Sequence, residues 1–406
     1  MKMRIVILTQ YFPPEVGAPQ NRLFELAVRL KKYGNEVTVL TAMPNYPAMQ
    51  IHESYKGKWF MKENMEGLRV IRSGIYVSKS KSIVKRLLNY YSFVVSSFFV
   101  GCFQVKEHDM LICESPPLFL GKTGWLLSVI HRSRFIFNVS DLWPESAEKL
   151  GLVTNKSMLR ISTLLEEFLY KRSWLITGQT QGIVSNIKNR FPHKNVYWLP
   201  NGVDTSLFKP ERNPKWKLEK GFRDSDFVFL YAGIIGHAQG LEIILKCAER
   251  TKNQPTIKYV LLGAGPEKEK LIQLKSDLNL ENVSFFDPVS KTEMKEVLAS
   301  VDGAIIPLRK LDLFLGAIPS KIFENLAMKI PVLLGVDGEA RGLFVDQGKC
   351  ALYFEPENDS ELASQAVRLV GDAILRQELT DNGVKYVSAC FERNKIVTDF
   401  MKELNG

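Results

Sequence analysis

Cysteine is scarce in this sequence and shows no pairing pattern. The five cysteines are odd in number, widely scattered, and lack the short spacings of metal-binding motifs: Cys102, Cys113, Cys247, Cys350 and Cys390. Such usage is typical of reduced thiols in a cytosol and argues against a disulfide framework.

Long apolar runs are also missing. No stretch reaches the roughly 18 uninterrupted apolar residues of a membrane-spanning helix. The apolar segment after Met1 is too short for a signal peptide and leads directly into Pro13 and Pro14, so we interpret it as a first β-strand. The sequence has no repeats and no low-complexity segments, and its 406 residues suffice for two domains with full cores.

Acidic residues are few in the first half of the chain. Residues 1–200 contain 27 Lys and Arg against 14 Asp and Glu, a net charge of +13, whereas the remaining residues contain 27 and 30, a net charge of −3. A basic half favours contact with an anionic partner, such as nucleic acid, a lipid surface or a phosphorylated acceptor. Because the basic residues show no nucleic-acid-binding signature, we expect no nucleic-acid partner.

The first half alternates strand and helix patterns. Strand patterns at residues 4–9 and 36–41 flank a helix pattern at 24–33, which ends at Gly34, and further buried-strand patterns follow at 110–113, 135–139, 174–177 and 196–199. This order predicts a doubly wound α/β domain. Ligands of such domains bind at the carboxyl ends of the strands, where Gly17 would let a backbone approach a phosphate or sugar. A glycine in a loop is, however, usually part of an ordinary turn.

A basic segment, residues 79–86, precedes an aromatic and nearly all-round apolar helix pattern at 87–103. We favour a buried helix after a solvated basic loop, because Asn89 and the serines lower the apolarity. The alternative is a helix that contacts a membrane surface.

Two carboxylates and a tryptophan directly follow the strand pattern at 135–139, in the segment 140–146. At the carboxyl end of a strand they could surround an acceptor hydroxyl, with Asp141 orienting or deprotonating it and Glu145 holding it. The same residues could simply cap a helix.

The α/β pattern restarts at residue 227. We interpret the charged stretch before it, residues 209–226, as a loop in which Asp224 and Asp226 are solvated. Glycines after the first strand permit close approach to a phosphate, and His237 among them is a candidate phosphate partner or an ordinary loop histidine. Further strand patterns at 260–262, 283–286 and 302–308 complete a second α/β domain whose loops gather at one edge. The candidate donor-binding residues in these loops are Gly233, Gly236, His237, Gly240, Pro288 and Val289.

The segment from Asp312 to Val336 predicts a loop, a helix and a strand. Pro319 and Ser320 can open the helix, since proline suits a first turn and a serine side chain can accept an orphan N–H group. Lys321 stands in the first turn, where a cation opposes the helix dipole unless an anion joins it. Glu324 follows one turn later, where it could reach a ribose while Lys321 and the backbone hold a diphosphate. An ordinary amphipathic helix before a buried strand would show the same pattern.

In this order the motifs resemble those of a GT-B glycosyltransferase of glycosyltransferase family 4, in particular its bacterial O-antigen and capsule subgroup that includes N-acetyl-L-fucosaminyltransferases. The likeness spans nearly the whole chain and is carried by residues 11–15, 45–47, 141–146, 199–204, 231–240, 319–324 and 326–332.

The resemblance implies two facing Rossmann-like domains with parallel sheets, which we expect at residues 1–200 for the acceptor and 201–385 for the donor nucleotide. It also implies that a last helix, 386–406, crosses back to the first domain. Transfer would retain anomeric configuration and need no metal or other cofactor.

Glu324 matches the second glutamate of the family's paired-glutamate motif, but the position of the first is Gly316. We therefore expect the backbone from Gly316 through Ala317, Pro319 and Ser320 to contact the donor sugar. Other positions depart too: Ser140 replaces a frequent histidine, and Ile234 and Gln239 replace a frequent arginine and lysine. Lys321, His237 and helix N-termini remain as phosphate candidates.

The resemblance implies a retaining transfer of an N-acetylated or 6-deoxy hexosamine from a UDP-sugar to an undecaprenyl-diphosphate-linked saccharide. The expected place is the cytoplasm, peripherally on the inner face of the cytoplasmic membrane, with contact to its anionic surface. A UDP-sugar 2-epimerase would share the nucleotide contacts but need no basic acceptor domain, and a phosphorylase would need a cofactor lysine that is not found. Loss of the carboxylate at Gly316 leaves open an inactive nucleotide-sugar-binding scaffold.

Overall fold

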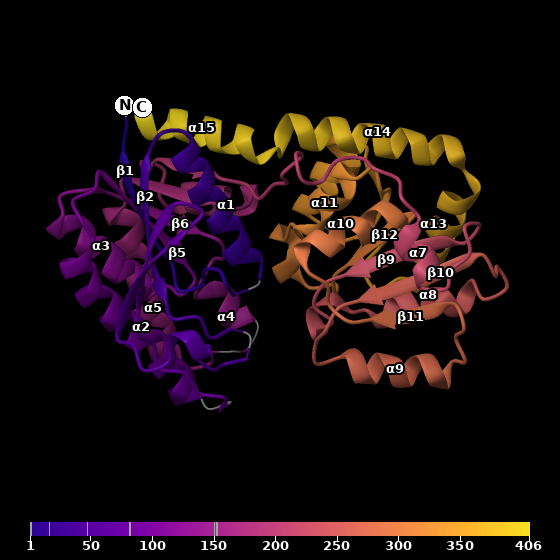
Figure 1. The fold of residues 1–406 in the computed structure, drawn as a ribbon, viewed down its shortest axis with the longest axis horizontal. Coiled ribbons are helices and arrows are strands. Elements are labelled where there is room, and N and C mark those ends of the chain that lie inside the picture. Colours follow the sequence, from indigo (N-terminus) through magenta and orange to yellow (C-terminus); the bar gives the residue numbers. More distant parts are fainter. Residues whose placement is uncertain (1, 16, 47, 81–82, 150, 152) are drawn as a thin grey trace. The chain divides into compact units, whose positions relative to one another are not determined.

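A computed structural model describes residues 2–15, 17–46, 48–80, 83–149, 151 and 153–406 (Figure 1). The chain forms two units, one of residues 1–201 with 396–406 and the other of residues 202–395. The first boundary lies one residue from the expected position, whereas the return to the first unit begins at Ile396 and not at residue 386. The helix Ala373–Cys390 belongs to the second unit.

The first unit is built on a sheet with the strand order β3-β4-β2-β1-β5-β6-β7-β8. All neighbouring pairs are parallel except β3 with β4, an antiparallel edge hairpin that was not predicted. The strands are β1 Arg4–Leu8, β2 Glu36–Ala42, β3 Phe60–Met65, β4 Leu68–Ser73, β5 Met110–Ser115, β6 Arg134–Val139, β7 Leu175–Gly178 and β8 Val196–Trp198.

Helices cover both faces of this sheet (Figure 1). Successive side chains of a strand point to opposite faces, so the buried strands present apolar side chains on both sides. Ile5 and Ile7 of β1 pack toward α1 and α15, whereas Val6 and Leu8 belong to the core on the side of α2, α3, α5 and α6. The helices are α1 Ala18–Lys32, α2 Ile83–Gln104, α3 Leu120–Ile130, α4 Glu145–Lys149, α5 Lys156–Arg172, α6 Gln181–Arg190 and α15 Arg393–Asn405, with a short 3-10 turn, η1, at Glu53–Tyr55.

The second unit holds a six-stranded, wholly parallel sheet with the order β11-β10-β9-β12-β13-β14. Its strands are β9 Phe227–Ala232, β10 Ile257–Leu262, β11 Val283–Phe286, β12 Gly303–Pro307, β13 Val332–Gly335 and β14 Ala351–Tyr353. Its helices are α7 Lys215–Glu219, α8 Glu242–Arg250, α9 Lys268–Asp277, α10 Lys291–Ser300, α11 Lys321–Ala327, α12 Glu339–Arg341, α13 Asp359–Gly371 and α14 Ala373–Cys390. The helical turns are η2 His237–Gln239, η3 Asp312–Gly316 and η4 Gly342–Gln347. The predicted class of two α/β domains with parallel sheets is confirmed.

The interpretation of residues 209–226 as a loop was wrong. Helix α7 lies within this stretch, and Lys217 is buried with its ammonium group 3.1 Å from Asp302 Oδ2 and from the carbonyl oxygen of Asp224. Asp224 is exposed as predicted, but Asp226 is buried and accepts a hydrogen bond from the Arg223 N–H group at 2.8 Å. These charged contacts therefore hold α7 at the amino end of β12, next to Asp302.

Candidate functional site

In the second unit, the loops that follow β9 and β10 are in backbone contact. Gly233 N–H donates to the Leu262 carbonyl, and Ile235 N–H donates to the Ala264 carbonyl, both at 2.9 Å. Gly263 has a φ of +157°, and a β-carbon there would overlap the carbonyl oxygen of Gly233. Glycine is thus required for the packing of the two loops, which fixes Gly233 at the carboxyl edge of the sheet.

Lys321 reaches this loop from the first turn of α11. Its Nζ lies 3.8 Å from the centroid of the Tyr231 ring, and a β-carbon on Gly233 would come within 2.8 Å of the same atom. The Tyr231 hydroxyl donates to the Ile234 carbonyl at 2.6 Å and so attaches the ring to the loop. Solvent reaches part of the Lys321 side chain, but protein atoms surround its ammonium group. This desolvation lowers the pKa of Lys321 to about 7, although the negative charge of Glu324 acts to raise it.

Helix α11 presents Lys321 and Glu324 on one face. These two residues are partly exposed, whereas the residues between and beyond them are buried: Ile322, Phe323, Asn325, Leu326 and Ala327. The spacing of three residues places the cation and the carboxylate side by side. This is the pair predicted to hold a diphosphate and a ribose.

Ser320 does not cap α11, so that prediction was wrong. Its backbone is already helical, with φ −60° and ψ −26°, and its side chain accepts no capping hydrogen bond. The first turn is closed instead by backbone bonds, from Ile322 N–H to the Pro319 carbonyl at 3.1 Å and from Phe323 N–H to the Ser320 carbonyl at 3.3 Å.

The segment that lacks the first motif glutamate packs on a neighbouring backbone. Gly316 ends the turn η3, and Gly316, Ala317, Pro319 and Ser320 are all partly exposed. A β-carbon on Gly338, which has a φ of +71°, would overlap the carbonyl oxygen of Leu315. This backbone contact positions the segment without a side chain at Gly316.

Arg309, which the sequence reasoning missed, holds the far end of the β9 loop. Its Nε–H donates to the His237 carbonyl at 2.8 Å, and its guanidinium group pairs with Glu242 at 2.6 Å and Glu357 at 2.9 Å. The sequence signal that could have identified Arg309 was an arginine two residues beyond the buried strand β12. Gly240 next to it has left-handed backbone angles, with φ +57° and ψ +42°.

The remaining donor candidates lie at the same edge of the sheet with fewer contacts. The side chain of His237 is exposed, and Gly236 is buried before the turn η2. Pro288 and Val289 lie between β11 and α10. Their role in donor binding stays a prediction.

In the first unit, a buried ion pair lies beneath the predicted acceptor loop. Arg22 of α1 and Glu114 of β5 are 2.5 Å apart, with side chains 8% and 4% exposed. Ser140 lies between them, because its hydroxyl donates to Glu114 at 2.5 Å and accepts from Arg22 at 2.6 Å. Asn138 donates to the other oxygen of Glu114. The sequence reasoning missed this network, since its members come from three separate elements.

Asp141 follows Ser140 and is partly buried. Its Oδ2 accepts a hydrogen bond from the Ser146 hydroxyl at 2.8 Å. Burial raises the pKa of Asp141, and the neighbouring charge of Glu145 adds to this, while the hydrogen bonds lower it. Glu145 begins α4 and pairs with Lys149 at 2.7 Å in a half-exposed position. The carboxylate of Asp141 is therefore more basic than that of an exposed aspartate, whereas Glu145 lies nearer the solvent.

Gly17 lies at the start of α1, at the same edge of this sheet. Its backbone is extended, with φ 174°, and a β-carbon there would overlap the side-chain oxygen of Gln20. Its predicted contact with the donor stays a prediction.

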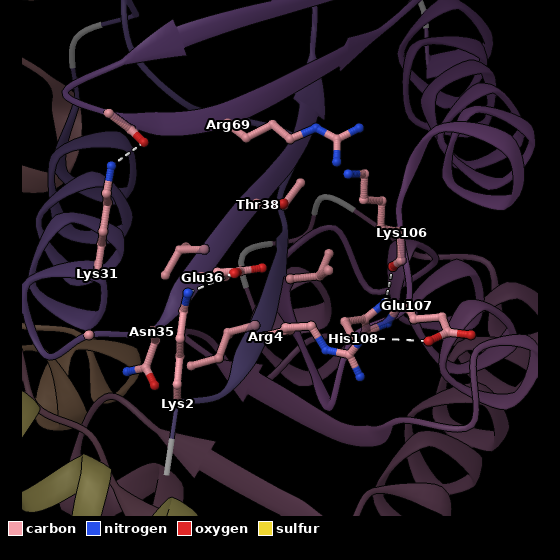
Figure 2. A pocket seen from close by; sticks show the side chains of 15 residues that line it. Lys2, Arg4, Lys31, Asn35, Glu36, Thr38, Arg69, Lys106, Glu107 and His108 are labelled. Carbon is pink, nitrogen blue, oxygen red and sulfur yellow. Dashed lines mark hydrogen bonds and ion pairs between the residues drawn. The ribbon is translucent and has the colours of Figure 1, made fainter.

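A cavity of about 900 Å³ opens at the opposite edge of this sheet, at the amino ends of β1, β2 and β4 (Figure 2). Lys2 pairs with Glu36 at 2.8 Å, Arg4 pairs with Asp109 at 3.0 Å, and Arg69 donates to the carbonyl at the end of α2 at 2.9 Å. These basic side chains thus have partners within the protein, and the cavity is not part of the predicted site.

Among the described residues, no group of three His, Cys, Asp or Glu side chains could hold a metal ion.

Known proteins resemble this chain over part or all of its length. Residues 213–386 match the model of the family described as Glycosyl transferases group 1. Over the whole of both chains, the protein is 25% identical to the putative colanic acid biosynthesis glycosyl transferase WcaI of Escherichia coli K12. It is 22% identical to the probable glycosyltransferase WbjE of Pseudomonas aeruginosa, over 57% of this chain and 58% of that protein.

Solved structures of similar fold have low sequence identity. Sucrose-phosphate synthase from Thermosynechococcus elongatus matches with a TM-score of 0.78 and 15% identity, over 100% of this chain and 98% of that one. Anabaena Alr3699/HepE, solved in complex with UDP and glucose, matches with a TM-score of 0.73 and 16% identity over all of both chains. These likenesses show the fold, two Rossmann-like α/β domains of the GT-B class.

Proposed function

We propose that this chain, a member of the group 1 glycosyltransferases with the GT-B fold, transfers a sugar from a UDP-sugar to a lipid-linked saccharide. The product would belong to a bacterial surface polysaccharide such as O-antigen or capsule. The full-length likeness to WcaI, whose name is putative colanic acid biosynthesis glycosyl transferase, and the partial likeness to WbjE support polysaccharide biosynthesis. The solved complex of HepE with UDP and glucose supports a nucleotide-sugar donor.

The observation that carries the proposal is the position of Lys321. Its ammonium group lies beside the glycine loop at the carboxyl edge of the second sheet, where α/β proteins bind nucleotides. We infer that Lys321 and the backbone N–H groups near it hold the diphosphate as it leaves, an electrostatic contribution that is worth several kcal/mol in comparable sites. Glu324 on the same helix face would accept hydrogen bonds from the ribose hydroxyls.

The donor sugar would contact backbone where related enzymes use a carboxylate. The partly exposed segment from Gly316 to Ser320 supplies this backbone, with Ala317 and Pro319 between them. We expect an N-acetylated or 6-deoxy hexosamine as the donor sugar. Transfer would retain the anomeric configuration, with attack on the face from which the diphosphate leaves, and would need no metal.

The acceptor would bind in the first unit. Asp141 would take the proton of the acceptor hydroxyl, since its raised pKa makes it a stronger base than an exposed aspartate. Glu145 would hold the saccharide from the start of α4. We expect the acceptor to be an undecaprenyl-diphosphate-linked saccharide, at the inner face of the cytoplasmic membrane.

The test is a transfer assay with a panel of UDP-, GDP- and ADP-sugars and detergent-dispersed lipid-linked saccharides. We expect transfer from UDP-sugars alone, and NMR of the product should show the anomeric configuration of the donor. Epimerised donor without transfer would indicate a 2-epimerase. Binding of UDP-sugar without any turnover would indicate the scaffold that the missing carboxylate at Gly316 leaves open.

A further inference from the structure

Helix α2 presents an apolar face to the solvent. Five large apolar residues, spaced three or four apart along the helix, are between 43% and 79% exposed: Leu88, Tyr91, Val95, Phe99 and Phe103. This spacing places them in one row, which we call the outer stripe. Contiguous exposed apolar surface of this kind indicates a binding partner.

Uncharged polar residues in the middle of α2 face the protein. Asn89 is buried and donates to the Tyr76 carbonyl at 2.6 Å, and the hydroxyl of buried Ser96 donates to Ser73 at 3.2 Å. Toward its own domain the helix also buries apolar side chains, among them Phe93 and Val100, so α2 is apolar on its solvent face as well as in the core, unlike an ordinary surface helix in water. The prediction of a buried helix describes only its inner face. Lys81 and Ser82, from the predicted basic segment before it, lie outside the described residues.

The charge around α2 selects among possible partners. Residues 67–106 contain seven Lys and Arg and no Asp or Glu. Residues 115–140, which include α3, contain three Lys and Arg and again no Asp or Glu. The two helices pack together, since the Thr123 hydroxyl donates to the Val94 carbonyl at 2.9 Å. A second copy of the chain would bring the same positive charge against this surface, whereas anionic lipid would be attracted to it.

We propose that the outer stripe of α2 lies on an anionic membrane surface, with its aromatic side chains in the boundary between headgroups and acyl chains. A spanning role does not fit, because no helix in the described part of the chain combines the length and apolarity needed to cross a bilayer. The helix would lie in the plane of the interface.

Aromatic contacts connect the outer stripe with the candidate acceptor site. The ring centroids of Tyr91 and Phe119 are 4.9 Å apart, and those of Phe119 and Trp143 are 5.8 Å apart. Trp143 comes two residues after Asp141. Gln10, just after β1, donates to Asn89 at 3.2 Å, so this end of α2 is at the carboxyl edge of the sheet. On the proposed function, on which this step rests, the lipid of the acceptor would follow the aromatic row and bring its saccharide to Asp141.

The experiment is co-sedimentation of the full chain with phosphatidylcholine vesicles that contain or lack phosphatidylglycerol. The variant Phe99→Glu/Phe103→Glu places two charges in the outer stripe at exposed positions. The control Ile374→Glu changes a residue that is 83% exposed on α14 of the second unit. We expect the parent and the control to bind anionic vesicles, and the double variant to bind at least tenfold more weakly, with UDP binding equal in all three.

Three results would overturn the inference. The first is a parent protein that stays free of anionic vesicles at low salt, and the second is a double variant that binds them as well as the parent. The third is a parent dimer, seen by light scattering, that the double variant converts to a monomer without any vesicle binding. Vesicle binding needs neither donor nor acceptor, so it can persist when no sugar is transferred, in which case only the proposed function fails. Transfer to a detergent-dispersed acceptor without vesicle binding would refute this inference alone.

Discussion

The ammonium group of Lys321 lies 3.8 Å from the centre of the Tyr231 ring. The ring face partly compensates the positive charge, but it cannot replace the water that the surrounding protein excludes. The pKa of Lys321 therefore falls to about 7 from an ordinary value of 10.5. A bound diphosphate would supply the missing negative charge and raise the pKa again.

Binding of UDP should consequently weaken as the pH rises above 7. In the free protein Lys321 loses its proton in this range, and binding must then take up a proton, which costs at most a tenfold change in Kd for each pH unit. The terminal phosphate of UDP is already largely ionised there, so it adds little to the trend. Calorimetry between pH 7 and 9 in buffers of different ionisation enthalpy would measure both the Kd and the proton uptake.

The variant Lys321→Met is the matched control for this pH dependence. It keeps an unbranched apolar side chain beside Tyr231 and removes the titrating group. We expect weaker binding of UDP with a Kd that no longer changes between pH 7 and 9. An unchanged pH trend in this variant would show that another group titrates.

The substitution Asp141→Asn should lower kcat by about 10²- to 10⁴-fold, the range for loss of a general base, while UDP binding stays unchanged. Because burial raises the pKa of Asp141, turnover in the parent should fall with decreasing pH already above about 3.9, the pKa of a free aspartate. Glu145→Gln should have a smaller effect, since Glu145 pairs with Lys149 near the solvent. Steady-state rates from pH 4 to 8 test the three proteins. If Asp141→Asn and Lys321→Ala both left turnover unchanged, the assignment of both residues would fail.

The sequence predicted those parts of the fold that depend on local periodicity. Strand and helix patterns located most elements of both sheets, and the polar pair Lys321 and Glu324 stands on one face of α11 as expected from a spacing of three residues. Helix α7 was not predicted because most of its residues are charged, although Trp216 and Lys217 are buried. A lysine that is buried by pairing with an aspartate 85 residues away leaves no local signal.

The unpredicted parts of the site are contacts between distant segments. The approach of Lys321 to Gly233 depends on the packing of α11 beside the β9 loop, and Arg309 reaches the same loop from β12. Likewise Arg22 and Glu114 are 92 residues apart and meet only because β1 and β5 are neighbours in the sheet. One sequence shows each partner as an ordinary charged residue and does not show the pairing.

The variant Gly263→Ala should destabilise the second unit by about 2 to 4 kcal/mol, because its β-carbon would overlap the Gly233 carbonyl and its φ is unfavourable for alanine. The shift of the β9 loop should also weaken UDP binding. Gly371→Ala is the control, since a β-carbon there meets no atom within 4 Å and the residue ends a helix. Urea unfolding followed by tryptophan fluorescence measures the difference. Equal stability of the two variants would argue against the close contact of the two loops.

Breaking the buried pair should show whether Ser140 and its partners act as one unit. Arg22→Met leaves Glu114 buried without its cation and should cost about 3 to 5 kcal/mol of the free energy of unfolding. Glu114→Gln should also be costly, because it leaves Arg22 uncompensated and weakens the bond from Ser140. In the double variant no charge remains buried, so the loss should be clearly smaller than the sum of the two single losses.

Lys171→Met removes an ion pair of similar type at the surface, where Lys171 and Glu167 are 62% and 35% exposed, and should cost no more than about 0.5 kcal/mol. Urea unfolding of all four variants supplies the free energies. Strictly additive losses in the double variant would mean that Arg22 and Glu114 act independently. In that case the loop that carries Asp141 would depend on its own packing and on the hydrogen bond from Ser146, and not on the ion pair beneath it.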